Sequence, residues 1–352
     1  MSKVIVLCST PYQIICALRI VEEKYPGAMV DIVLTDTITN VEGIYERLSQ
    51  ESELRNVFLW RTKGKICFSR IQKILYAICP ARMAKRTLKK NDCELVEKYD
   101  IYLFANLSPI AMCLGDVLRR ENPKIEVAMY EDGFSTYSSY TGDFYKNRKQ
   151  KILKKFFFSV NKLYVFNPDI IEWKPQFEVK KITPCFKGDT LELINRIFEY
   201  DMLEDDYGKK VVFFEESYSS DGRPVDDVEM LDIIAEKLGK ENIIVKIHPR
   251  NPVNRFAEKG YITNRNRSIP WEVILINEEF KDTIFVTMAS NAAMNPFFLF
   301  GKKNKAILLY KCTKMPESMH KSIVEFDDRL CSKYPEIFVI PQNLDELKDI
   351  IK

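Results

Sequence analysis

The chain has 352 residues, of which 46% are hydrophobic and 29% are charged, and its formal net charge is +3. This composition is typical of a soluble globular protein, and the length predicts two domains. No apolar run reaches the roughly 18 residues that a membrane span needs, and the first residues enter a short strand instead of a signal peptide. We therefore expect an intracellular, cytoplasmic protein.

Cofactor and metal motifs are absent from the sequence. The nine cysteines are scattered without a Cys-x-x-Cys pair, which is typical of reduced, buried thiols. We find no Asp-x-Asp motif, no paired histidines, no Walker A motif and no Gly-x-Gly-x-x-Gly. We therefore expect no metal and no cofactor, so a phosphate-handling enzyme of this kind must rely on side-chain and backbone donors.

Short runs of β-branched and aromatic residues alternate with amphipathic stretches along the chain. Strands are expected at 4–8, 30–34, 57–60, 101–104, 127–130, 163–166, 211–214, 243–247, 284–287, 306–309 and 337–340. Helices are expected at 12–24, 109–121, 225–238, 273–280, 292–300 and 344–352. This alternation predicts an α/β protein with parallel sheets and βαβ crossovers.

The alternation is interrupted between residues 167 and 209, where three prolines precede the acidic segment 199–206. We place the domain junction there, which gives the domains 1–170 and 210–340, a linker at 171–209 and a C-terminal helix at 341–352. This last helix is expected to pack back across the first domain. Two Rossmann-like domains facing each other across a ligand cleft correspond to the GT-B architecture.

Two adjacent carboxylates and a glycine follow the predicted strand at 127–130, as Glu131, Asp132 and Gly133. Gly133 tolerates backbone conformations that other residues resist, so the loop can turn sharply and project Asp132 into the cleft. Neighbouring carboxylates raise each other's pKa, which helps one of them act as a base near neutral pH. The alternative is a plain polar turn, because Asp-Gly is common in loops.

His248 is one of only two histidines, and it follows the strand at 243–247. Pro249 ends this strand by removing a backbone donor. Ligands of open α/β sheets collect outside the carboxyl ends of the strands. A titratable imidazole in a fixed turn beside Arg250 therefore suits a phosphate-bearing ligand. The alternative is a loop histidine that only satisfies local hydrogen bonds.

Ser290, Asn291 and Ala292 follow the strand at 284–287 and open a predicted helix. Free backbone amides and a hydroxyl at a helix start bind phosphate well. Simple N-capping by Ser290 or Asn291 is the alternative, and it is compatible with phosphate binding.

Weaker signals could complete a nucleotide site. Glu272 offers a carboxylate to ribose hydroxyls, unless it is only an acid at a helix start. Glu216 and Ser217 follow the strand at 211–214, with Asp221 a few residues further on, and they also face the expected cleft.

Five segments together resemble glycosyltransferase family 52, the bacterial sialyltransferases of lipooligosaccharide and capsule synthesis. They are Cys-Ser-Thr-Pro-Tyr-Gln at 8–13, Glu-Asp-Gly at 131–133, His-Pro-Arg at 248–250, Ser-x-Pro-x-Glu at 268–272 and Ser-Asn-Ala-Ala at 290–293. Their order and spacing match from residue 8 to about residue 300. The resemblance implies a GT-B fold, a CMP-sialic acid donor, no metal and inversion at the anomeric carbon.

The resemblance also implies roles for single residues. Asp132 would be the general base that deprotonates the acceptor hydroxyl, with support from Glu131. His248 would hydrogen-bond or protonate the departing CMP phosphate, Ser290 and Asn291 would hold that phosphate, and Glu272 would bind the ribose. In part of the family the base follows the first strand of the second domain, so Asp221 or Glu216 could take this role. Other residues assigned by this resemblance are, on the donor side, Pro249, Arg250, Ala292 and Ser217, and, on the acceptor side, Thr10, Pro11 and Gln13.

Basic residues are unevenly distributed. Residues 61–90 contain ten Lys or Arg and no acid, and residues 146–162 are again basic without an acid. We expect a peripheral contact with an anionic inner membrane, in which the phenylalanines at 156–158 insert beside Lys154 and Lys155. For residues 61–90, a solvated helix face is favoured over such a contact. Nucleic acid binding is disfavoured because aromatic residues rarely alternate with the basic ones.

The sequence thus favours an inverting, metal-independent sialyltransferase that transfers sialic acid to a galactoside of a bacterial surface glycan. The linkage and the exact acceptor stay open, and related enzymes make a homodimer a candidate assembly. Two other functions fit the same residues. One is a different GT-B enzyme, such as a glycerophosphate or other sugar transferase, and the other is a non-catalytic glycan- or membrane-binding protein.

Overall fold

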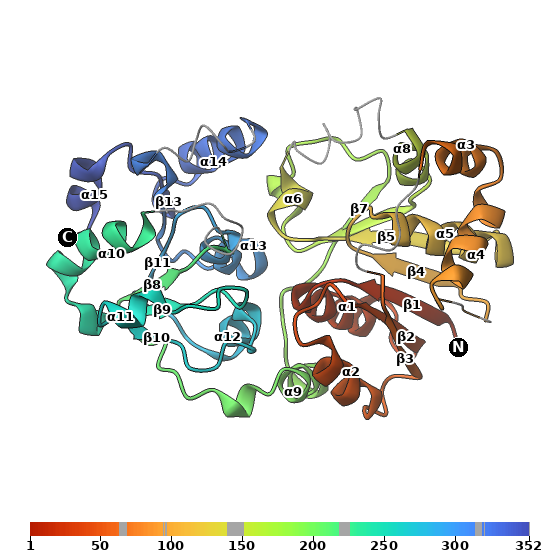
Figure 1. The fold of residues 1–352 in the computed structure, drawn as a ribbon, viewed down its shortest axis with the longest axis horizontal. Coiled ribbons are helices and arrows are strands. Elements are labelled where there is room, and N and C mark those ends of the chain that lie inside the picture. The colour runs from red at the N-terminus through yellow and green to blue at the C-terminus, as the bar shows by residue number, and fades with distance from the viewer. Residues whose placement is uncertain are drawn as a thin grey trace. The chain divides into compact units, whose positions relative to one another are not determined.

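A computed structural model of the protein describes residues 1–62, 69–93, 95, 97–138, 151–217, 226–313, 319 and 321–351. The chain divides into two compact units, Met1–Ile197 and Phe198–Lys352 (Figure 1). Each unit contains one sheet in which every described strand pair is parallel. Parallel sheets of this kind are covered by helices on both faces, which explains why most of their strands are apolar throughout.

The first unit has a sheet of seven strands in the order β3-β2-β1-β4-β5-β6-β7. The strands are β1 (Lys3–Cys8), β2 (Met29–Thr35), β3 (Asn56–Trp60), β4 (Ile101–Phe104), β5 (Glu126–Tyr130), β6 (Lys162–Val165) and β7 (Glu178–Lys181). The order reverses between β1 and β4, which is the kind of place where α/β sheets open a crevice at their carboxyl edge.

Helices cover both faces of this sheet (Figure 1). On one face α1 (Pro11–Lys24) and α2 (Val41–Ser49) contact α9 (Gly188–Ile197). On the other face lie α3 (Arg70–Ile78), α4 (Pro80–Lys90), α5 (Pro109–Glu121) and α8 (Lys151–Phe157), and the short α6 (Phe134–Tyr137) follows β5. The helices α1 and α5 start as their sequences dictate, since Thr10 and Ser108 cap them and a proline occupies the first turn of each.

The second unit has a sheet of six strands in the order β10-β9-β8-β11-β12-β13. The strands are β8 (Val211–Phe214), β9 (Ile243–Lys246), β10 (Ile262–Thr263), β11 (Ile284–Thr287), β12 (Ala306–Leu308) and β13 (Phe338–Val339). The helices are α10 (Asp227–Leu238), α11 (Arg255–Glu258), α12 (Trp271–Asn277), α13 (Asn295–Phe300), α14 (Lys321–Lys333) and α15 (Leu344–Ile350).

Alternate residues of β8 point to the two faces of the second sheet. Val211 and Phe213 are buried in a cluster with side chains of α10, α11 and α15. Phe214 points to the other side, where its ring packs edge-on against Trp271 of α12 with ring centroids 4.7 Å apart. Because both faces are filled, only the ends of the strands are left for polar groups.

Every strand predicted from the sequence is present, but the stretch 171–209 is more ordered than expected. β7 pairs with β6, and α9 buries Leu193, Ile194 and Ile197, so both elements belong to the first unit. β7 is an edge strand that contains lysines and has a proline on either side. It therefore does not form an apolar run that would predict a strand. The last helix also differs from the expectation, because Leu347 of α15 is buried in the core of the second unit.

The expectation that three consecutive phenylalanines insert into a membrane is wrong for two of them. Phe156 and Phe157 are only 4% and 3% exposed, and Phe158 is 44% exposed. Phe156 packs against Phe104 of β4, and Phe157 packs against Trp173. These two side chains therefore attach α8 to the sheet and take no part in the surface.

The close approach of α5 and α8 depends on a glycine. A Cβ atom on Gly115 would lie 2.5 Å from the Phe156 ring, so Gly115→Ala is expected to lower the free energy of unfolding by about 1–3 kcal/mol. Gly43→Ala on α2 is the control, because its Cβ would meet only the side-chain ends of Arg47 and Asn40, at 3.3–3.4 Å. The control should be neutral or should stabilise by up to about 1 kcal/mol. Urea denaturation checks both, and equal stabilities for the two variants would contradict this packing.

Candidate functional site

Asp132 lies just past the end of β5 and is held by amides from two other elements. Gln13 of α1 donates from Nε2 to one carboxylate oxygen at 2.7 Å, and Asn106, just after β4, donates from Nδ2 to the other at 3.0 Å. Thr136 Oγ1 accepts a hydrogen bond from the Asp132 backbone N–H at 2.7 Å. The side chain is partly exposed. Two neutral side-chain amides from different elements therefore fix the orientation of this carboxylate.

The turn after Asp132 requires a glycine. Gly133 has φ = 70° and ψ = −148°, a conformation that residues with a side chain rarely adopt. Nothing lies within 4 Å of a Cβ built at this position, so the requirement comes from the backbone alone. The predicted sharp turn is therefore present, and it leads directly into α6.

Glu131 is fully buried and acts as an anchor. Its two oxygens accept hydrogen bonds from the hydroxyls of Tyr12 and Tyr137, and from the Phe166 backbone N–H at 2.7 Å. Burial raises the pKa of Glu131 to about 7, although these three donors oppose the shift. Burial, and not the charge of Asp132, is the main cause of the raised pKa.

The predicted acceptor-side residues lie around this carboxylate pair. Thr10 caps α1 by accepting from the Gln13 backbone N–H at 3.2 Å, and Pro11 occupies the first turn. The buried Gln13 accepts from the Ser9 backbone N–H at 2.6 Å while its amide group donates to Asp132. Thr10 and Pro11 therefore position the helix start, and Gln13 positions Asp132.

His248 follows β9 in a turn whose hydrogen bonds orient its ring. The His248 carbonyl accepts from the Asn251 backbone N–H at 2.9 Å, so Pro249 and Arg250 occupy the middle of a tight turn. The Arg250 backbone N–H donates to His248 Nδ1 at 3.2 Å. A neutral ring with an acceptor at Nδ1 carries its proton on Nε2, which can therefore donate.

A buried carboxylate fixes the backbone at His248. Glu215, directly after β8, accepts from the His248 backbone N–H at 3.0 Å and from Arg255 Nη2 at 3.1 Å. Arg255 also binds both carboxylate oxygens of the buried Asp227, at 3.0 and 2.9 Å. Two acids therefore share one guanidinium, and this group ties α10 and α11 to the carboxyl ends of β8 and β9.

Glu216 connects the end of β8 to the end of β11. Its Oε1 accepts from Thr287 Oγ1 at 3.1 Å and from the Ala289 backbone N–H at 2.9 Å. Burial raises the pKa of Glu216 to about 7, against the lowering effect of these two donors. Next to it, Ser217 Oγ accepts from Arg250 Nη2 at 2.8 Å. The predicted donor-side residues Glu216, Ser217 and Arg250 therefore form one group at the carboxyl edge of the second sheet.

Ser290 caps a short 3₁₀ turn at Asn291–Ala293 that precedes α13. Its Oγ accepts from the Ala292 backbone N–H at 3.3 Å, and its own backbone N–H donates to Thr287 Oγ1 at 3.1 Å. Asn291 is exposed, whereas Ala292 is partly buried. The predicted N-cap is present, and Thr287 links it to Glu216.

Glu272 lies in the first turn of α12 and accepts from Asn295 Nδ2 at 2.7 Å. Burial raises the pKa of Glu272, while its own backbone N–H, Lys246 and Asn295 oppose the shift. Lys246 is a buried lysine of β9 that donates from Nζ to the Ile269 carbonyl at 3.1 Å. Burial lowers the pKa of Lys246 to about 8, opposed by Glu272 and Asp205. Glu272 is therefore a carboxylate next to a buried amine.

Some site residues were predicted and others were missed. Asp221 lies outside the described residues. The residue patterns did not point to Asn106, Lys246, Asn295 or the pair formed by Asp227 and Arg255. Two of these had a visible signal, because Asn106 follows a predicted strand and Lys246 interrupts an apolar one. The hydrogen bonds and ion pairs of these residues join positions that are far apart in the sequence, so no local sequence pattern predicts them.

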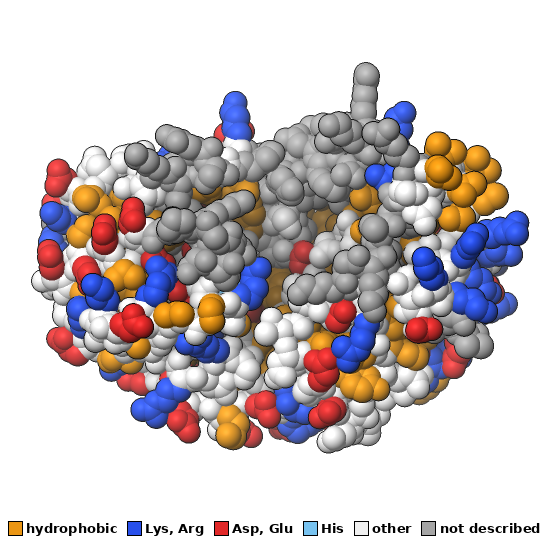
Figure 2. Space-filling model, in the orientation of Figure 1, with side chains coloured by type: hydrophobic (Ala, Val, Ile, Leu, Met, Phe, Trp, Pro, Cys, Tyr) orange, Lys and Arg blue, Asp and Glu red, His pale blue; other side chains and the backbone are white. Residues whose placement is uncertain are grey.

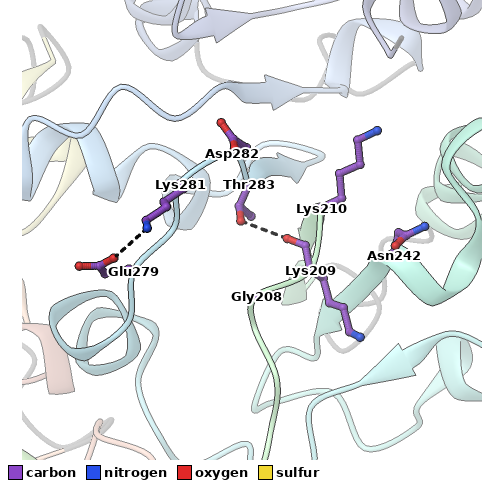
Figure 3. Close-up of a pocket in the computed structure, with 8 residues that line it drawn as sticks. All are labelled: Gly208, Lys209, Lys210, Asn242, Glu279, Lys281, Asp282 and Thr283. Atoms are coloured by element: carbon purple, nitrogen blue, oxygen red, sulfur yellow. Dashed lines mark hydrogen bonds and ion pairs between the residues drawn. The ribbon is translucent and has the colours of Figure 1, made fainter.

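A pocket of about 670 Å³ lies in the second unit, away from these residues (Figure 3). Its lining comes from residues that precede β8, β9 and β11, among them Lys209, Asn242 and Thr283. This is the amino edge of the sheet, and its exposed Lys281 and Glu279 pair with each other at 3.9 Å. The pocket is therefore separate from the carboxyl-edge site, where ligands of such sheets bind.

Within the described part of the chain, no three His, Cys, Asp or Glu side chains are grouped so that they could hold a metal ion. None of the described helices combines the length and the apolar character needed to cross a membrane.

The profile of the alpha-2,8-polysialyltransferase (POLYST) family matches residues 4–309. The chain belongs to the alpha-2,8-polysialyltransferase family. The match extends over all the carboxyl-edge residues described above, from Thr10 to Ala292. The family is one of sialyltransferases, which agrees with the activity expected from the resemblance to glycosyltransferase family 52, although it is a different family description. Among curated proteins, no sequence matches significantly.

Solved structures show that the fold of this polysialyltransferase-family protein is that of GT-B glycosyltransferases. UGT89C1 of Arabidopsis thaliana complexed with UDP-L-rhamnose is 13% identical with a TM-score of 0.58, and the match covers 99% of this chain and 89% of that one. UGT2 of Phytolacca americana complexed with UDP-2fluoro-glucose and pterostilbene is 10% identical with a TM-score of 0.56, covering 100% and 90%. The UDP-GlcNAc 2-epimerase of Methanocaldococcus jannaschii is 15% identical with a TM-score of 0.51, covering 100% and 92%. The predicted α/β GT-B fold is therefore confirmed.

The raised pKa of Glu216 predicts that stability falls with rising pH. Between its ordinary pKa of 4.5 and the folded value of about 7, the folded chain retains a proton that the unfolded chain has lost. The free energy of unfolding should therefore fall as pH rises through this window. Glu216→Gln keeps the acceptor for Thr287 and Ala289 but does not ionise, so it should weaken this pH dependence.

Urea denaturation of both proteins at pH 5.5 and pH 8 measures the difference. Glu131 contributes a similar dependence in both, because burial raises its pKa to about 7 as well, so a reduced slope and not a flat one is expected. An unchanged slope in Glu216→Gln would contradict the assignment.

Proposed function

We propose that the protein is an inverting, metal-independent sialyltransferase that uses CMP-sialic acid as its donor. Family membership supports the sialyl group, and the GT-B fold supports a nucleotide-linked donor. The observation that carries the proposal is the pairing of chemistries at two carboxyl edges. Asp132 lies just past the end of β5, is partly exposed and accepts hydrogen bonds from two side-chain amides. His248 lies just past the end of β9, and its Nδ1 accepts a hydrogen bond.

In this reaction the bond between the anomeric carbon and the phosphate oxygen of the donor breaks, and negative charge grows on the departing CMP. His248 donates a hydrogen bond or a proton from Nε2 to that phosphate, and Ser290 and Asn291 supply further donors. Such preorganised donors stabilise a developing anion by a few kcal/mol each. Pro249 keeps the turn rigid, and Arg250 adds a positive charge beside it.

Asp132 accepts the proton of the acceptor hydroxyl as the new glycosidic bond forms. Attack from the face opposite the departing phosphate inverts the anomeric carbon. The base needs reach and modest basicity only, because the alcohol proton moves late. Gln13 and Asn106 hold Asp132 in place, while Glu131 fixes the loop from inside the protein. We favour Asp132 as the base over Glu216, because Glu216 joins the end of β8 to the end of β11 through Thr287 and the Ala289 backbone N–H.

Glu272 is proposed to bind the ribose hydroxyls, as a carboxylate close to the His248 strand and held by Asn295. The acceptor is either a galactoside, as the resemblance to family 52 implies, or the 8-hydroxyl of a sialic acid, as the name of the matching family suggests. Activity assays with a galactoside and with an oligosialic acid acceptor distinguish the two.

Asp132→Ala should lower kcat by about 10²–10⁴-fold, the usual contribution of a general base. His248→Ala should lower kcat by about 10²–10³-fold, as for loss of one donor to a developing anion. The measurement is sialyl transfer from CMP-sialic acid in the presence of EDTA, after circular dichroism has shown that each variant is folded.

Asp100→Ala is the matched control for Asp132→Ala. Asp100 is exposed and precedes β4, at the amino edge of the same sheet, where it accepts from the Lys3 backbone N–H at 2.9 Å. The control should keep full activity. Full activity in Asp132→Ala or in His248→Ala would remove the corresponding role.

Calorimetry should show that CMP binds more tightly than CDP or UDP, with and without EDTA, because CMP is the group that leaves a CMP-sialic acid donor. Glu272→Gln should weaken CMP binding by about tenfold, since an amide accepts from ribose hydroxyls less strongly than a carboxylate does. Preference for UDP or CDP would instead favour a different sugar transferase. A glycerophosphate transferase also releases CMP, so it is distinguished by transfer from a CDP-linked donor and not from CMP-sialic acid.

A further inference from the structure

The helix α3 carries an apolar stripe that faces solvent. Ile71, Ile74, Leu75 and Ile78 follow the i, i+3, i+4, i+7 spacing of a helix face that normally packs against a core. They are instead 71%, 61%, 45% and 70% exposed. Monomeric soluble proteins rarely leave such contiguous apolar surface uncovered, so the stripe indicates a binding surface.

The stripe belongs to a helix that is well anchored on its other side. Tyr76 is 1% exposed, and its hydroxyl donates to Asp116 of α5 at 2.6 Å. Ser69 and Gln72 form a capping box that starts the helix. The fold therefore holds α3 in an orientation that presents the four aliphatic side chains outward. Figure 2 shows hydrophobic side chains gathered over α3, with Lys and Arg side chains next to them over α4.

The neighbouring helix α4 is a cationic surface. Five of its side chains are exposed Lys or Arg, and none of them forms an ion pair with any residue in the described parts of the chain; they are Arg82, Lys85, Arg86, Lys89 and Lys90. Ala84 and Leu88 are the residues of α4 that are buried. The sequence from 61 to 90 contains no acid that could neutralise these charges.

A third element, α8, contacts α3 and extends the same surface. The exposed Phe158 follows its last turn, and the Lys154 ammonium lies 5.6 Å from the centre of that ring. An aromatic side chain with a lysine at its face combines apolar surface and positive charge. The helices α3 and α4 together offer the same combination.

We propose that α3, α4 and the end of α8 form a docking surface for an anionic lipid bilayer. The aliphatic stripe of α3 and the ring of Phe158 enter the interfacial region, and the cations of α4 bind lipid headgroups. This is the arrangement by which amphipathic helices lie in the plane of a membrane. The inference is independent of which donor and acceptor the enzyme uses.

Charge decides between a bilayer and a second copy of the chain as the partner. A symmetric dimer formed through the α3 stripe would bring the same surface of both copies together. The acid-free cationic helices beside the two stripes would then approach each other, and their like charges would repel. An anionic bilayer instead offers apolar contact to the stripe and opposite charge to α4.

Vesicle flotation with the full chain tests the proposal. Wild-type protein should bind phosphatidylglycerol-containing vesicles and not pure phosphatidylcholine vesicles, and the binding should weaken as salt is raised. Ile71→Ser/Ile74→Ser/Ile78→Ser should lower the partition coefficient by at least about tenfold. Lys85→Gln/Arg86→Gln/Lys89→Gln should lower it by about 100-fold, from roughly fivefold for each charge near the surface.

Matched controls come from the second unit. Val253→Ser/Ile262→Ser removes two side chains that are 54% and 40% exposed, and Lys209→Gln/Lys210→Gln/Lys281→Gln removes three cations around the pocket in Figure 3. Both controls should bind vesicles like wild type, and thermal unfolding should show that all variants are folded. Equal binding to neutral vesicles, or unchanged binding of the α3 variant, would overturn the proposal. So would a dimer, seen by sedimentation velocity without lipid, that the α3 substitutions abolish.

Discussion

Both sheets of this protein are parallel and covered by helices on both faces, and this constraint determines where polar chemistry can occur. Most side chains on the faces of the central strands are buried and apolar, so most of the polar groups described above lie at the strand ends. A carboxylate that is buried at such an end must find its donors inside the protein. Glu131 and Glu215 satisfy this requirement with tyrosine hydroxyls, a guanidinium and backbone N–H groups. These two fixed carboxylates give the neighbouring Asp132 and His248 rigid backbones.

Two acids follow one another directly after β5 and again after β8, and the two members of each pair have different surroundings. Glu131 and Asp132 are neighbours in sequence, yet one is fully buried and the other is partly exposed. In the second unit Glu215 holds the His248 backbone, while Glu216 connects β8 to β11. In each unit the first acid after the strand is buried and holds the backbone or the loop, and the second is less buried.

The fold could be predicted from the sequence because parallel strands buried on both faces are continuous apolar runs. β7 was not predicted because it is an edge strand that contains lysines. β10 was not predicted because it has only two residues. A helix within residues 61–90 was considered, but no bounds for α3 and α4 followed from the sequence. The first helix is apolar on its exposed side, and five of the eleven residues of the second are Lys or Arg. In α3 the usual relation between the apolar pattern and the core is reversed, whereas α4 buries the apolar Ala84 and Leu88.

The site could be predicted only in part. Asp132, His248 and Ser290 were found because each directly follows a recognisable strand, and such positions share one edge of a sheet. Their partners could not be found in this way. Asn106 reaches Asp132 from another strand end, and Arg255 of α11 joins Glu215, which follows β8, to Asp227 of α10. Such contacts depend on the tertiary fold, which residue patterns along the chain do not encode locally.

The strand order has a consequence for how the protein is made on the ribosome. β1 is a central strand, paired with β2 on one side and β4 on the other, but β4 is synthesised about a hundred residues later. At translation rates of 5–20 residues per second, one side of this apolar strand stays unpaired for roughly 5–20 seconds. During that interval the nascent chain offers an open edge to other chains. β1 can therefore pair on both sides only after residues 101–104 have been synthesised.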